Sequence, residues 1–587
     1  MSVVVGVDIG TTSTKAVAFD TRGREVAGAS AGYPLEEPHP GWAEQDPAAI
    51  LDAVRSSIRD VAAQLDQPVA GLSFSSAMHT LIGLDADGSP LTSSLSWADS
   101  RAAAQAERLR SAAGGLALHR RTGTPVHPMA PLPKLVWFRE QEPKLAERVA
   151  FWVGIKDYVL AQLCEALVTD HSLASGTGLM DIVRLDWDPE ALQLAGITPE
   201  QLPELVPTTH VLSGLSGDLG LPSGTPVVVG AGDGPLANLG LGAVDPGVAA
   251  CSIGTSGAMR VMVEKPAVDP LGGVFCYALT EDRWVVGGAI NNGGIVLDWA
   301  GHALAPELGE QPAERLLELA GRVPPGADGL IMLPYLLSER APHWSALPRG
   351  AYVGLTREHR REHLVRAAIE GVCQQLALVL QSMRAAGNEV RQMRATGGFA
   401  RSPLWRQVLA DTLGMDVQFP AGHEGSGFGA ALLGMQALGL VDSIDVAGDL
   451  VRIEDTVRPE AAAVGVYAAL RPVFAELYDA LVPTYRSLRR LSPQLPLDQS
   501  NEAARSPAGK GRCDGPQWIA GAPGRDPGLG SGPCRTQNRA TSVTPARPAR
   551  RAGPPERRRT WSCRRPTSTT SPPAPAPAAT SASTAGR

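Results

Sequence analysis

Residues 3–12 are Val-Val-Val-Gly-Val-Asp-Ile-Gly-Thr-Thr. The valine-rich run at 3–7 is typical of a buried strand, and the segment 8–12 is a polar glycine turn. A second apolar-alternating stretch spans 15–20, and a further turn leads to a third strand that starts polar at Arg24. The pattern predicts three consecutive strands joined by short turns.

A helix follows these strands. Asp46 and Pro47 form an N-cap and first-turn proline pair, which predicts that a helix begins there. Its apolar residues share one face: Ile50, Leu51, Val54, Ile58, Val61 and Leu65. Strands that alternate with such helices predict an α/β fold.

The strand-turn-strand pattern returns near the middle of the chain. Residues 226–230 read as an apolar strand, and 249–253 lead into Gly254-Thr255-Ser256-Gly257 before the apolar segment 258–263. We therefore expect two similar domains, with a boundary near Asp245. Later helices are predicted at 363–386, before Gly387, and from Ser402-Pro403 to Gly414.

Charge divides the 587 residues into two unlike parts. Residues 496–587 hold 15 of the 53 Lys and Arg but 5 of the 60 Asp and Glu, so the net charge of -7 combines a tail of +10 with a body of -17. An acidic body argues against nonspecific nucleic-acid binding by that part. The tail also holds 15 of the 49 prolines, which predicts disorder, although a basic nucleic-acid arm is an alternative reading.

The remaining composition favours a soluble cytoplasmic protein. The seven cysteines are widely spaced, without a CxxC pair or a metal-ligand spacing. The N-terminus lacks a basic region, Asp8 interrupts its apolar run, and no apolar stretch has the length of a membrane span.

The turn at 8–12 suits phosphate binding. Its backbone N–H groups and hydroxyls face one small volume, Asp8 could hold Mg²⁺ through water, and Lys15 follows as a cation. An ordinary hairpin turn is the alternative, but the Gly-Thr-Ser turn at 254–256 supplies a second donor cluster. The sequence contains neither a P-loop motif nor a strand-GxGxxG-helix motif.

Polar residues also follow other predicted strands. Asp233 lies in Gly-Ala-Gly-Asp-Gly directly after the strand at 226–230, where α/β proteins hold reacting groups. Its alternative role is to cap the helix that begins near Pro235. His79 and the segment 97–101 likewise follow strand-like runs.

These residues resemble the FGGY carbohydrate kinases. Residues 129–138 and the stretch from Gly350 through Glu370 resemble the two family signatures, and DIGTTSTK, SIGTSG and GGFARSPLWRQVLAD extend the similarity from residue 3 to about 490. The resemblance implies two actin-like ATPase domains of ribonuclease-H-like fold, with a nucleotide and sugar cleft between them. It implies domains at 1–245 and 246–495, and the tail at 496–587 has no counterpart.

The resemblance also implies site residues for ATP and Mg²⁺. By position, the nucleotide-binding residues would be Gly10, Thr11, Thr12, Ser13, Lys15, Gly254, Thr255, Gly294, Asp298, Gly398 and Ser402. Asp233 falls on the family's catalytic base and, with Asp8, would serve the metal. Its carboxylate would accept the proton of the attacking sugar hydroxyl.

The sugar-side segments, including 73–79 and 154–158, look most like those of gluconate kinases. The implied reaction is phosphorylation of D-gluconate, with substrate contacts from His79, Asp99, Arg101 and Lys156. For Arg101 an internal ion pair with Asp99 is the alternative. Two other functions stay open: a xylulose-kinase-like enzyme that acts on another sugar or polyol, and a noncatalytic sugar-binding regulator. We expect a small sugar acid as partner, no membrane partner, and a homodimer as one option.

Overall fold

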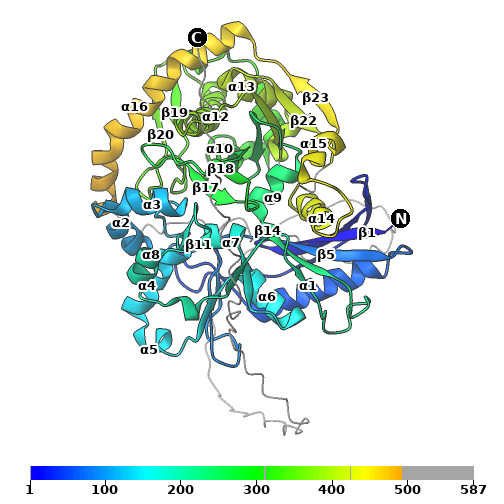
Figure 1. The fold of residues 1–587 in the computed structure, drawn as a ribbon. Helices are drawn as coiled ribbons and strands as arrows, with labels where there is room; N and C mark the ends of the chain where they lie inside the picture. Colours follow the sequence, from blue (N-terminus) through cyan, green and yellow to red (C-terminus); the bar gives the residue numbers. More distant parts are fainter. Residues whose placement is uncertain (1, 310–311, 423–424, 492–587) are drawn as a thin grey trace, which may run out of the picture. The chain divides into compact units, whose positions relative to one another are not determined.

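The computed structural model describes residues 2–309, 312–422 and 425–491 (Figure 1). The three predicted N-terminal strands are β1 (Val3–Ile9), β2 (Ser13–Phe19) and β3 (Glu25–Gly32). They pair as consecutive antiparallel neighbours, so this prediction is confirmed. The backbone N–H of Gly10 donates to the carbonyl of Ser13 at 3.0 Å and closes the turn between β1 and β2.

The first sheet has six strands in the order β13-β14-β5-β1-β2-β3. Its other strands are β5 (Val69–Ser76), β13 (Val211–Leu212) and β14 (Val227–Gly232). β5 runs parallel to both β1 and β14. The carboxyl ends of these three strands therefore meet at one sheet edge, where β1 leads into Gly10, β5 into His79 and β14 into Asp233.

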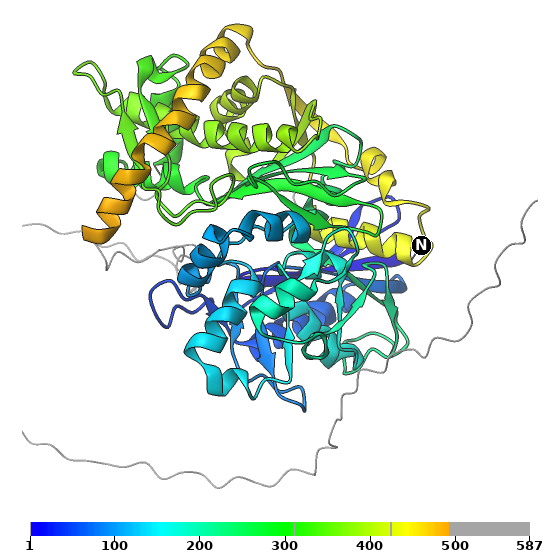
Figure 2. The ribbon, with the colours of Figure 1, turned by 60° about the vertical axis from the view of Figure 1, so that its left-hand side comes forward.

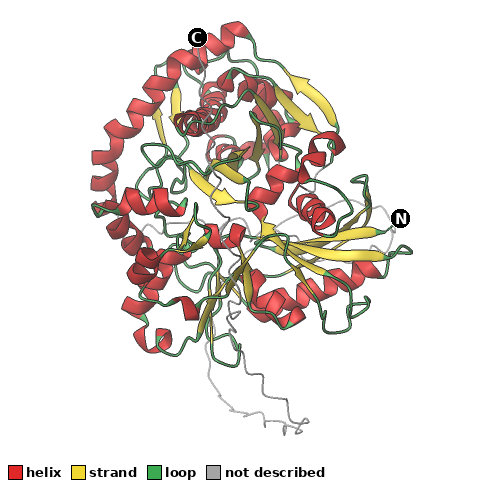
Figure 3. Cartoon of the chain, viewed as in Figure 1, coloured by secondary structure: helices red, strands yellow, loops and turns green. Residues whose placement is uncertain are grey.

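The second sheet repeats this arrangement. Its seven strands are, in order, β17 (Phe275–Ala278), β18 (Trp284–Ile290), β16 (Gly257–Val263), β15 (Val248–Ile253), β21 (Gln392–Thr396), β22 (Val417–Pro420) and β23 (Ile453–Val457). As in the first sheet, three antiparallel strands (β15, β16, β18) continue into two parallel ones (β21, β22). The expected pair of similar α/β domains is confirmed, and Figure 3 shows both sheets in yellow.

Helices cover both faces of the first sheet. On one face, Val3, Val5 and Val7 pack with α1 (Pro47–Ala62) and α6 (Ile155–Cys164). α1 begins as predicted, with Asp46 accepting the N–H of Ala48, but it ends before Leu65. On the other face, Val4 packs with α9 (Asp233–Gly240) and α14 (Gly425–Ala437).

α14 comes from late in the chain yet packs against β1 through glycine. A β-carbon on Gly6 would lie 2.1 Å from the carbonyl oxygen of Gly427, so only glycine permits this approach. Figure 2 shows α14, in yellow, beside the blue N-terminal strands. The domain boundary near Asp245 stays a prediction, and the predicted tail at 496–587 lies outside the described residues.

The second sheet is packed by α10 (Ile295–Leu304), α12 (Arg361–Ala385), α13 (Pro403–Leu413) and α16 (Ala461–Leu491). α12 and α13 fall close to the predicted helices, and Ser402 caps α13 as expected. By length and composition α12 alone among the described helices could cross a membrane, and 89% of its most apolar window is buried inside the protein.

Shorter elements complete the described chain. The further helices are α2 (Ala103–Ser111), α3 (Gly115–Thr122), α4 (Pro131–Gln141), α5 (Pro143–Ala146), α7 (His171–Ser175), α8 (Pro189–Ala195), α11 (Ala313–Ala320) and α15 (Ala447–Leu450). The short strands are β4 (Glu44–Gln45), β6 (Ile82–Leu84), β7 (Ser94–Leu95), β8 (Phe151–Val153), β9 (Val168–Asp170), β10 (Met180–Asp181), β11 (Asp186–Trp187), β12 (Glu204–Val206), β19 (Ile331–Leu333) and β20 (Ala351–Val353).

Gly230 controls the path of β14 toward Asp233. Its φ is 74°, a β-carbon there would lie 1.8 Å from the carbonyl oxygen of Phe74, and the β14–β5 register shifts at this point. We expect Gly230→Ala to lower the free energy of unfolding by about 3 kcal/mol, since both backbone strain and a backbone clash oppose the methyl group.

Chemical denaturation followed by circular dichroism measures this loss. Gly224→Ala is the matched control, because a β-carbon at Gly224 meets nothing within 4 Å. Equal stabilities of the two variants would contradict the role assigned to Gly230.

Candidate active site

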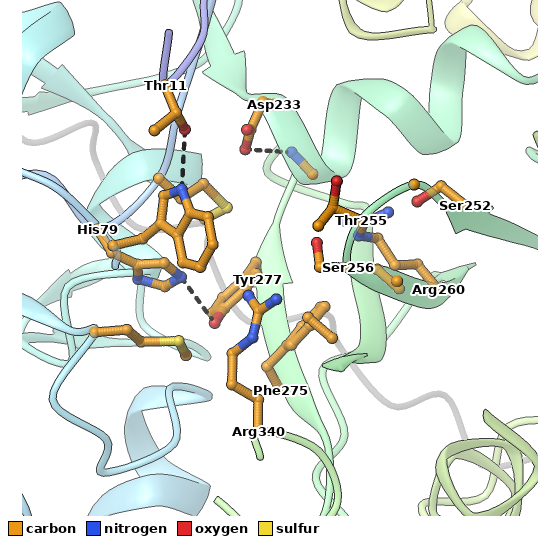
Figure 4. A pocket seen from close by; sticks show the side chains of 18 of the residues that line it. Thr11, His79, Asp233, Ser252, Thr255, Ser256, Arg260, Phe275, Tyr277 and Arg340 are labelled. Carbon is orange, nitrogen blue, oxygen red and sulfur yellow. Dashed lines mark hydrogen bonds between the residues drawn. The ribbon is translucent and has the colours of Figure 1, made fainter. Parts of the chain in front are cut away.

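A cavity of about 340 Å³ lies where the carboxyl ends of β5 and β14 face the second sheet. Both sheets contribute to its lining, as Figure 4 shows. The lining residues are Thr11, Met78, His79, Trp97, Met129, Asp233, Gly234, Ser252, Gly254, Thr255, Ser256, Gly257, Ala258, Arg260, Phe275, Tyr277, Ala289, Arg340 and Trp344. Three residues singled out in different parts of the sequence, Thr11, His79 and Asp233, therefore share one cavity.

Asp233 is the first residue of α9 and is half-buried in this cavity. Its Oδ1 accepts the N–H of Gly234 at 2.7 Å, so the side chain also satisfies a donor of the first helical turn. Burial, assisted by the negative charge of Asp8 and opposed by the guanidinium of Arg260, raises the pKa of Asp233 to about 6. The carboxylate is thus ionised at neutral pH yet closer to proton uptake than an exposed aspartate.

Lys156 lies outside the cavity lining and contacts the end of β14, just before Asp233. Its Nζ pairs with Asp170 at 2.7 Å, with both side chains fully buried, and lies 3.4 Å from the carbonyl of Ala231. Asp170 accepts the N–H of Ser172 at 3.0 Å, and Ser172 Oγ accepts the N–H of Gly232 at 3.2 Å. This network fixes the end of β14, so the geometry gives Lys156 a positioning role and does not bring it to the cavity.

His79 lines the cavity in neutral form. Burial lowers the pKa of His79 to about 3. Its Nδ1 lies 2.6 Å from the carbonyl oxygen of Gly176, which requires the proton on Nδ1 and leaves Nε2 as an acceptor. The hydroxyl of Tyr277 lies 3.4 Å from that Nε2. The imidazole can therefore accept a hydrogen bond from a ligand hydroxyl in the cavity.

The β1–β2 turn reaches the cavity through Thr11. The indole N–H of Trp97 donates to Thr11 Oγ1 at 2.9 Å. The other nucleotide candidates of this segment, Gly10, Thr12, Ser13 and Lys15, lie in or beside the turn but outside the cavity lining. Lys15 is exposed on β2, opposite Asp8 in the antiparallel register.

Asp8 lies near enough to Asp233 for its negative charge to raise the pKa of Asp233. Ser426 Oγ donates to Asp8 Oδ2 at 2.8 Å. The described residues contain no group of three or more His, Cys, Asp or Glu side chains that could hold a metal ion by themselves. Two carboxylates nevertheless fit Mg²⁺, which commonly takes one or two carboxylates and completes its shell with water and substrate phosphates.

A second cavity, of about 580 Å³, adjoins the first at Gly254 and Thr255, which line both. It contains all the nucleotide candidates predicted for the second half of the chain: Gly254, Thr255, Gly294, Asp298, Gly398 and Ser402. The N–H of Gly294 donates to the carbonyl of Gly254 at 2.7 Å and holds the start of α10 against this turn. A phosphate chain placed at the turn would thus extend from one cavity toward the other.

Asp99 and Arg101 form a buried ion-paired cluster outside both cavity linings. The Arg101 guanidinium contacts Asp99 at 2.7 Å and also pairs with Glu44, and its side chain is only 3% exposed. It lies 3.7 Å from the ring centre of Trp42. Asp99 in turn accepts the N–H of Ala43 at 2.9 Å. The alternative considered for Arg101, an internal ion pair, is what the structure contains.

The cavity contains two cations that sequence reasoning missed, Arg260 and Arg340. Arg260 interrupts the otherwise apolar strand β16, and this isolated charge was the available signal. Arg340 lies in a loop and carries no comparable signal. Lys134 of α4 was also missed: its buried Nζ donates to the carbonyls of Ser96, Met129 and His79 at 2.6 to 3.2 Å, which holds three cavity-forming loops together.

Known proteins share this architecture. Models of the FGGY family of carbohydrate kinases match the chain with the N-terminal domain at residues 3–240 and the C-terminal domain at 249–438. Gluconokinase of Bacillus subtilis (strain 168) is 42% identical over 500 residues, covering 83% of this chain and 98% of that protein. Xylulose kinase of the same strain is 31% identical over 490 residues, covering 81% and 97%.

A solved structure agrees with these sequence relatives. The gluconate kinase from Lactobacillus acidophilus matches with a TM-score of 0.80 at 36% identity, covering 83% of this chain and 99% of that chain. The chain therefore belongs to the FGGY family of carbohydrate kinases.

Proposed function

We propose that this carbohydrate kinase transfers the γ-phosphoryl group of ATP to the terminal hydroxyl of D-gluconate, giving 6-phosphogluconate and ADP. The observation that carries the proposal is the pair of adjoining cavities that share Gly254 and Thr255, with Asp233 in one of them. The 42% identity to a gluconokinase, against 31% to a xylulose kinase, supports a sugar acid as the substrate.

In this proposal Asp233 is the general base. Its carboxylate accepts the proton of the sugar hydroxyl while that oxygen attacks the γ-phosphorus. Because the transition state of phosphoryl transfer is loose, the carboxylate mainly orients the nucleophile and needs only moderate basicity. A pKa raised to about 6 meets this requirement at neutral pH.

Other residues position the two substrates. His79 Nε2 accepts a hydrogen bond from a sugar hydroxyl, and the turns at 10–13 and 254–255 direct N–H groups and hydroxyls toward the phosphates. Asp8 and Asp233 would hold Mg²⁺, which supplies charge neutralisation of the phosphates when it is bound. Gly294, Asp298, Gly398 and Ser402 would bind the ribose and adenine.

A neutral ketose is the second candidate substrate, because xylulose kinase of Bacillus subtilis also matches the chain over most of its length. We further infer a cytoplasmic location and no nucleic-acid partner for the acidic body. Asp99 and Arg101 could contact the substrate directly only if their ion pairs rearranged. A homodimer and a dispensable tail at 496–587 stay predictions from the sequence.

A substrate panel tests the proposed function. The purified full chain is given ATP and Mg²⁺ with gluconate, xylulose, glycerol, ribulose or fuculose, and ADP release is measured. We expect kcat/KM for gluconate to exceed that for each neutral compound by at least about tenfold. A neutral compound offers no anionic group to the cavity cations Arg260 and Arg340, which weakens its binding. A tenfold preference for any neutral sugar would refute the gluconate assignment.

The proposed base predicts a pH dependence. Only the ionised carboxylate can accept a proton, so kcat/KM should fall as the pH drops through about 6, by about tenfold per pH unit below it. The measurement uses limiting concentrations of both substrates, so that the free enzyme is titrated.

Asp233→Asn is the control for this limb. The variant should still bind nucleotide while losing about 100-fold or more in kcat, and its residual activity should lack the acidic limb. A residual rate above about a tenth of the wild-type rate, or an unchanged limb, would remove Asp233 from the role of base.

A further inference from the structure

Arg260 lies on β16 of the second sheet and lines the cavity. In the strand register Arg260 of β16 lies opposite Gly287 of β18, which lies opposite Phe275 of β17. Directly opposed residues project to the same face of a sheet, so Gly287 leaves the space between Arg260 and Phe275 without a side chain. A β-carbon at Gly287 would lie 2.9 Å from the Cα of Arg260. The sheet therefore has room for a long cationic side chain at this point.

The Arg260 guanidinium is half-buried and forms no ion pair with any carboxylate of the described chain. Its Nε lies 3.4 Å from the position that a β-carbon on Gly234 would occupy, so it borders the residue after Asp233. Buried arginines are rarely left without an anion, because desolvation of the charge is costly. The cavity therefore suits a ligand with a negative group.

Arg340 adds a second cation to the same cavity. Its guanidinium donates to the carbonyl of Ile290 at 3.2 Å and lies 4.9 Å from the ring centre of Trp97. The Tyr277 hydroxyl is within electrostatic range of both guanidinium groups. Figure 4 shows Tyr277 and Arg340 on the side of the cavity away from Asp233. Two cations and a hydroxyl thus face the space that a substrate would occupy.

Two anionic groups could reach Arg260, a carboxylate of the sugar and the phosphoryl group in transfer. Arg260 and Arg340 line the cavity that contains Asp233 and His79, and neither lines the cavity with Gly294, Asp298, Gly398 and Ser402. Arg340 and Tyr277 lie on the side of the first cavity away from Asp233, where a phosphoryl group in transfer would not reach. The body of the chain, with its charge of -17, repels an anionic sugar unless local cations attract it. These observations favour the carboxylate.

We propose that Arg260, assisted by Arg340 and Tyr277, binds the carboxylate of the sugar acid and makes the site selective for sugar acids over neutral sugars. This inference rests on the proposed function. A guanidinium can hold a carboxylate with two parallel hydrogen bonds, which a neutral hydroxymethyl group cannot match.

The test compares gluconate with D-glucitol, which has a hydroxymethyl group in place of the carboxylate. Removing the guanidinium in Arg260→Gln should raise KM for gluconate by about 30-fold or more, since a buried charged partner is lost. KM for ATP and kcat/KM for D-glucitol should change by less than about threefold, because neither contact depends on the carboxylate. The preference for gluconate should fall by at least tenfold. Arg260→Met, which suits the apolar strand, gives the same readout if the glutamine variant does not fold.

Arg283→Gln is the matched control. Arg283 lies in the turn before β18, outside the cavity lining and beside Asp282 at 3.0 Å, so the variant removes the same charge without altering the cavity. Its KM for gluconate should stay within about twofold of wild type.

Three results would overturn the inference. Equal losses on gluconate and D-glucitol in the Arg260 variants would assign the guanidinium to the phosphoryl group, and an unchanged gluconate KM would remove it from the site. In both cases a wild-type preference for gluconate leaves the proposed function standing. If wild-type enzyme itself prefers a neutral sugar, the proposed function fails together with this inference.

Discussion

The hydrogen bonds that hold the Gly254–Thr255 turn against the start of α10 organise the whole site. The N–H of Gly294 donates to the carbonyl of Gly254 at 2.7 Å, and the N–H of Gly293 donates to that of Thr255 at 3.0 Å. β-Carbons at these two glycines would lie 2.8 and 2.6 Å from the nearest carbonyl oxygens, so the approach requires glycine. Because this turn lines both cavities, its position sets the boundary between them.

Charge placement explains how an acidic protein could accept an acidic substrate. Asp233 and the nearby Asp8 supply negative charge, and Arg260 and Arg340 supply positive charge to the lining of the same cavity as Asp233. In a partly desolvated cavity such charges act more strongly than the diffuse charge of the surface. The guanidinium of Arg260 opposes the effect of burial on the pKa of Asp233, which lies at about 6, so this carboxylate is ionised near neutral pH.

Local sequence patterns predicted the elements whose signals are local. The valine run of β1, the Asp46-Pro47 start of α1 and the two Gly-Thr turns all occur where expected. The packing of α14 on the first sheet could not be predicted, since it depends on a contact between Gly6 and Gly427, residues more than 400 positions apart.

The site residues likewise divide into those with a local sequence signal and those that depend on distant contacts. Asp233 and His79 were singled out because each follows a strand-like run, and Thr11 because it lies in a Gly-Thr-Thr turn; all three line one cavity. Arg101 and Lys156 were plausible cations by type, yet each lies beside a buried aspartate that satisfies its charge. Arg260 was missed because its direction depends on the register of three strands and on the space left by Gly287. Charge alone does not identify a ligand-binding cation, because a cation can be paired with an anion inside the fold.

The orientation of gluconate in the cavity can be read from the carbon atom that receives the phosphate. In the proposed binding mode the carboxylate of gluconate lies at Arg260 and Arg340, and the terminal hydroxyl at the other end of the six-carbon chain lies at Asp233. Phosphorus and carbon NMR of the product formed from gluconate and ATP should therefore show a single phosphate ester on C6 and a free carboxylate. A phosphate on any other carbon, or an acyl phosphate on the carboxyl group, would contradict this orientation and the roles assigned to both ends of the cavity.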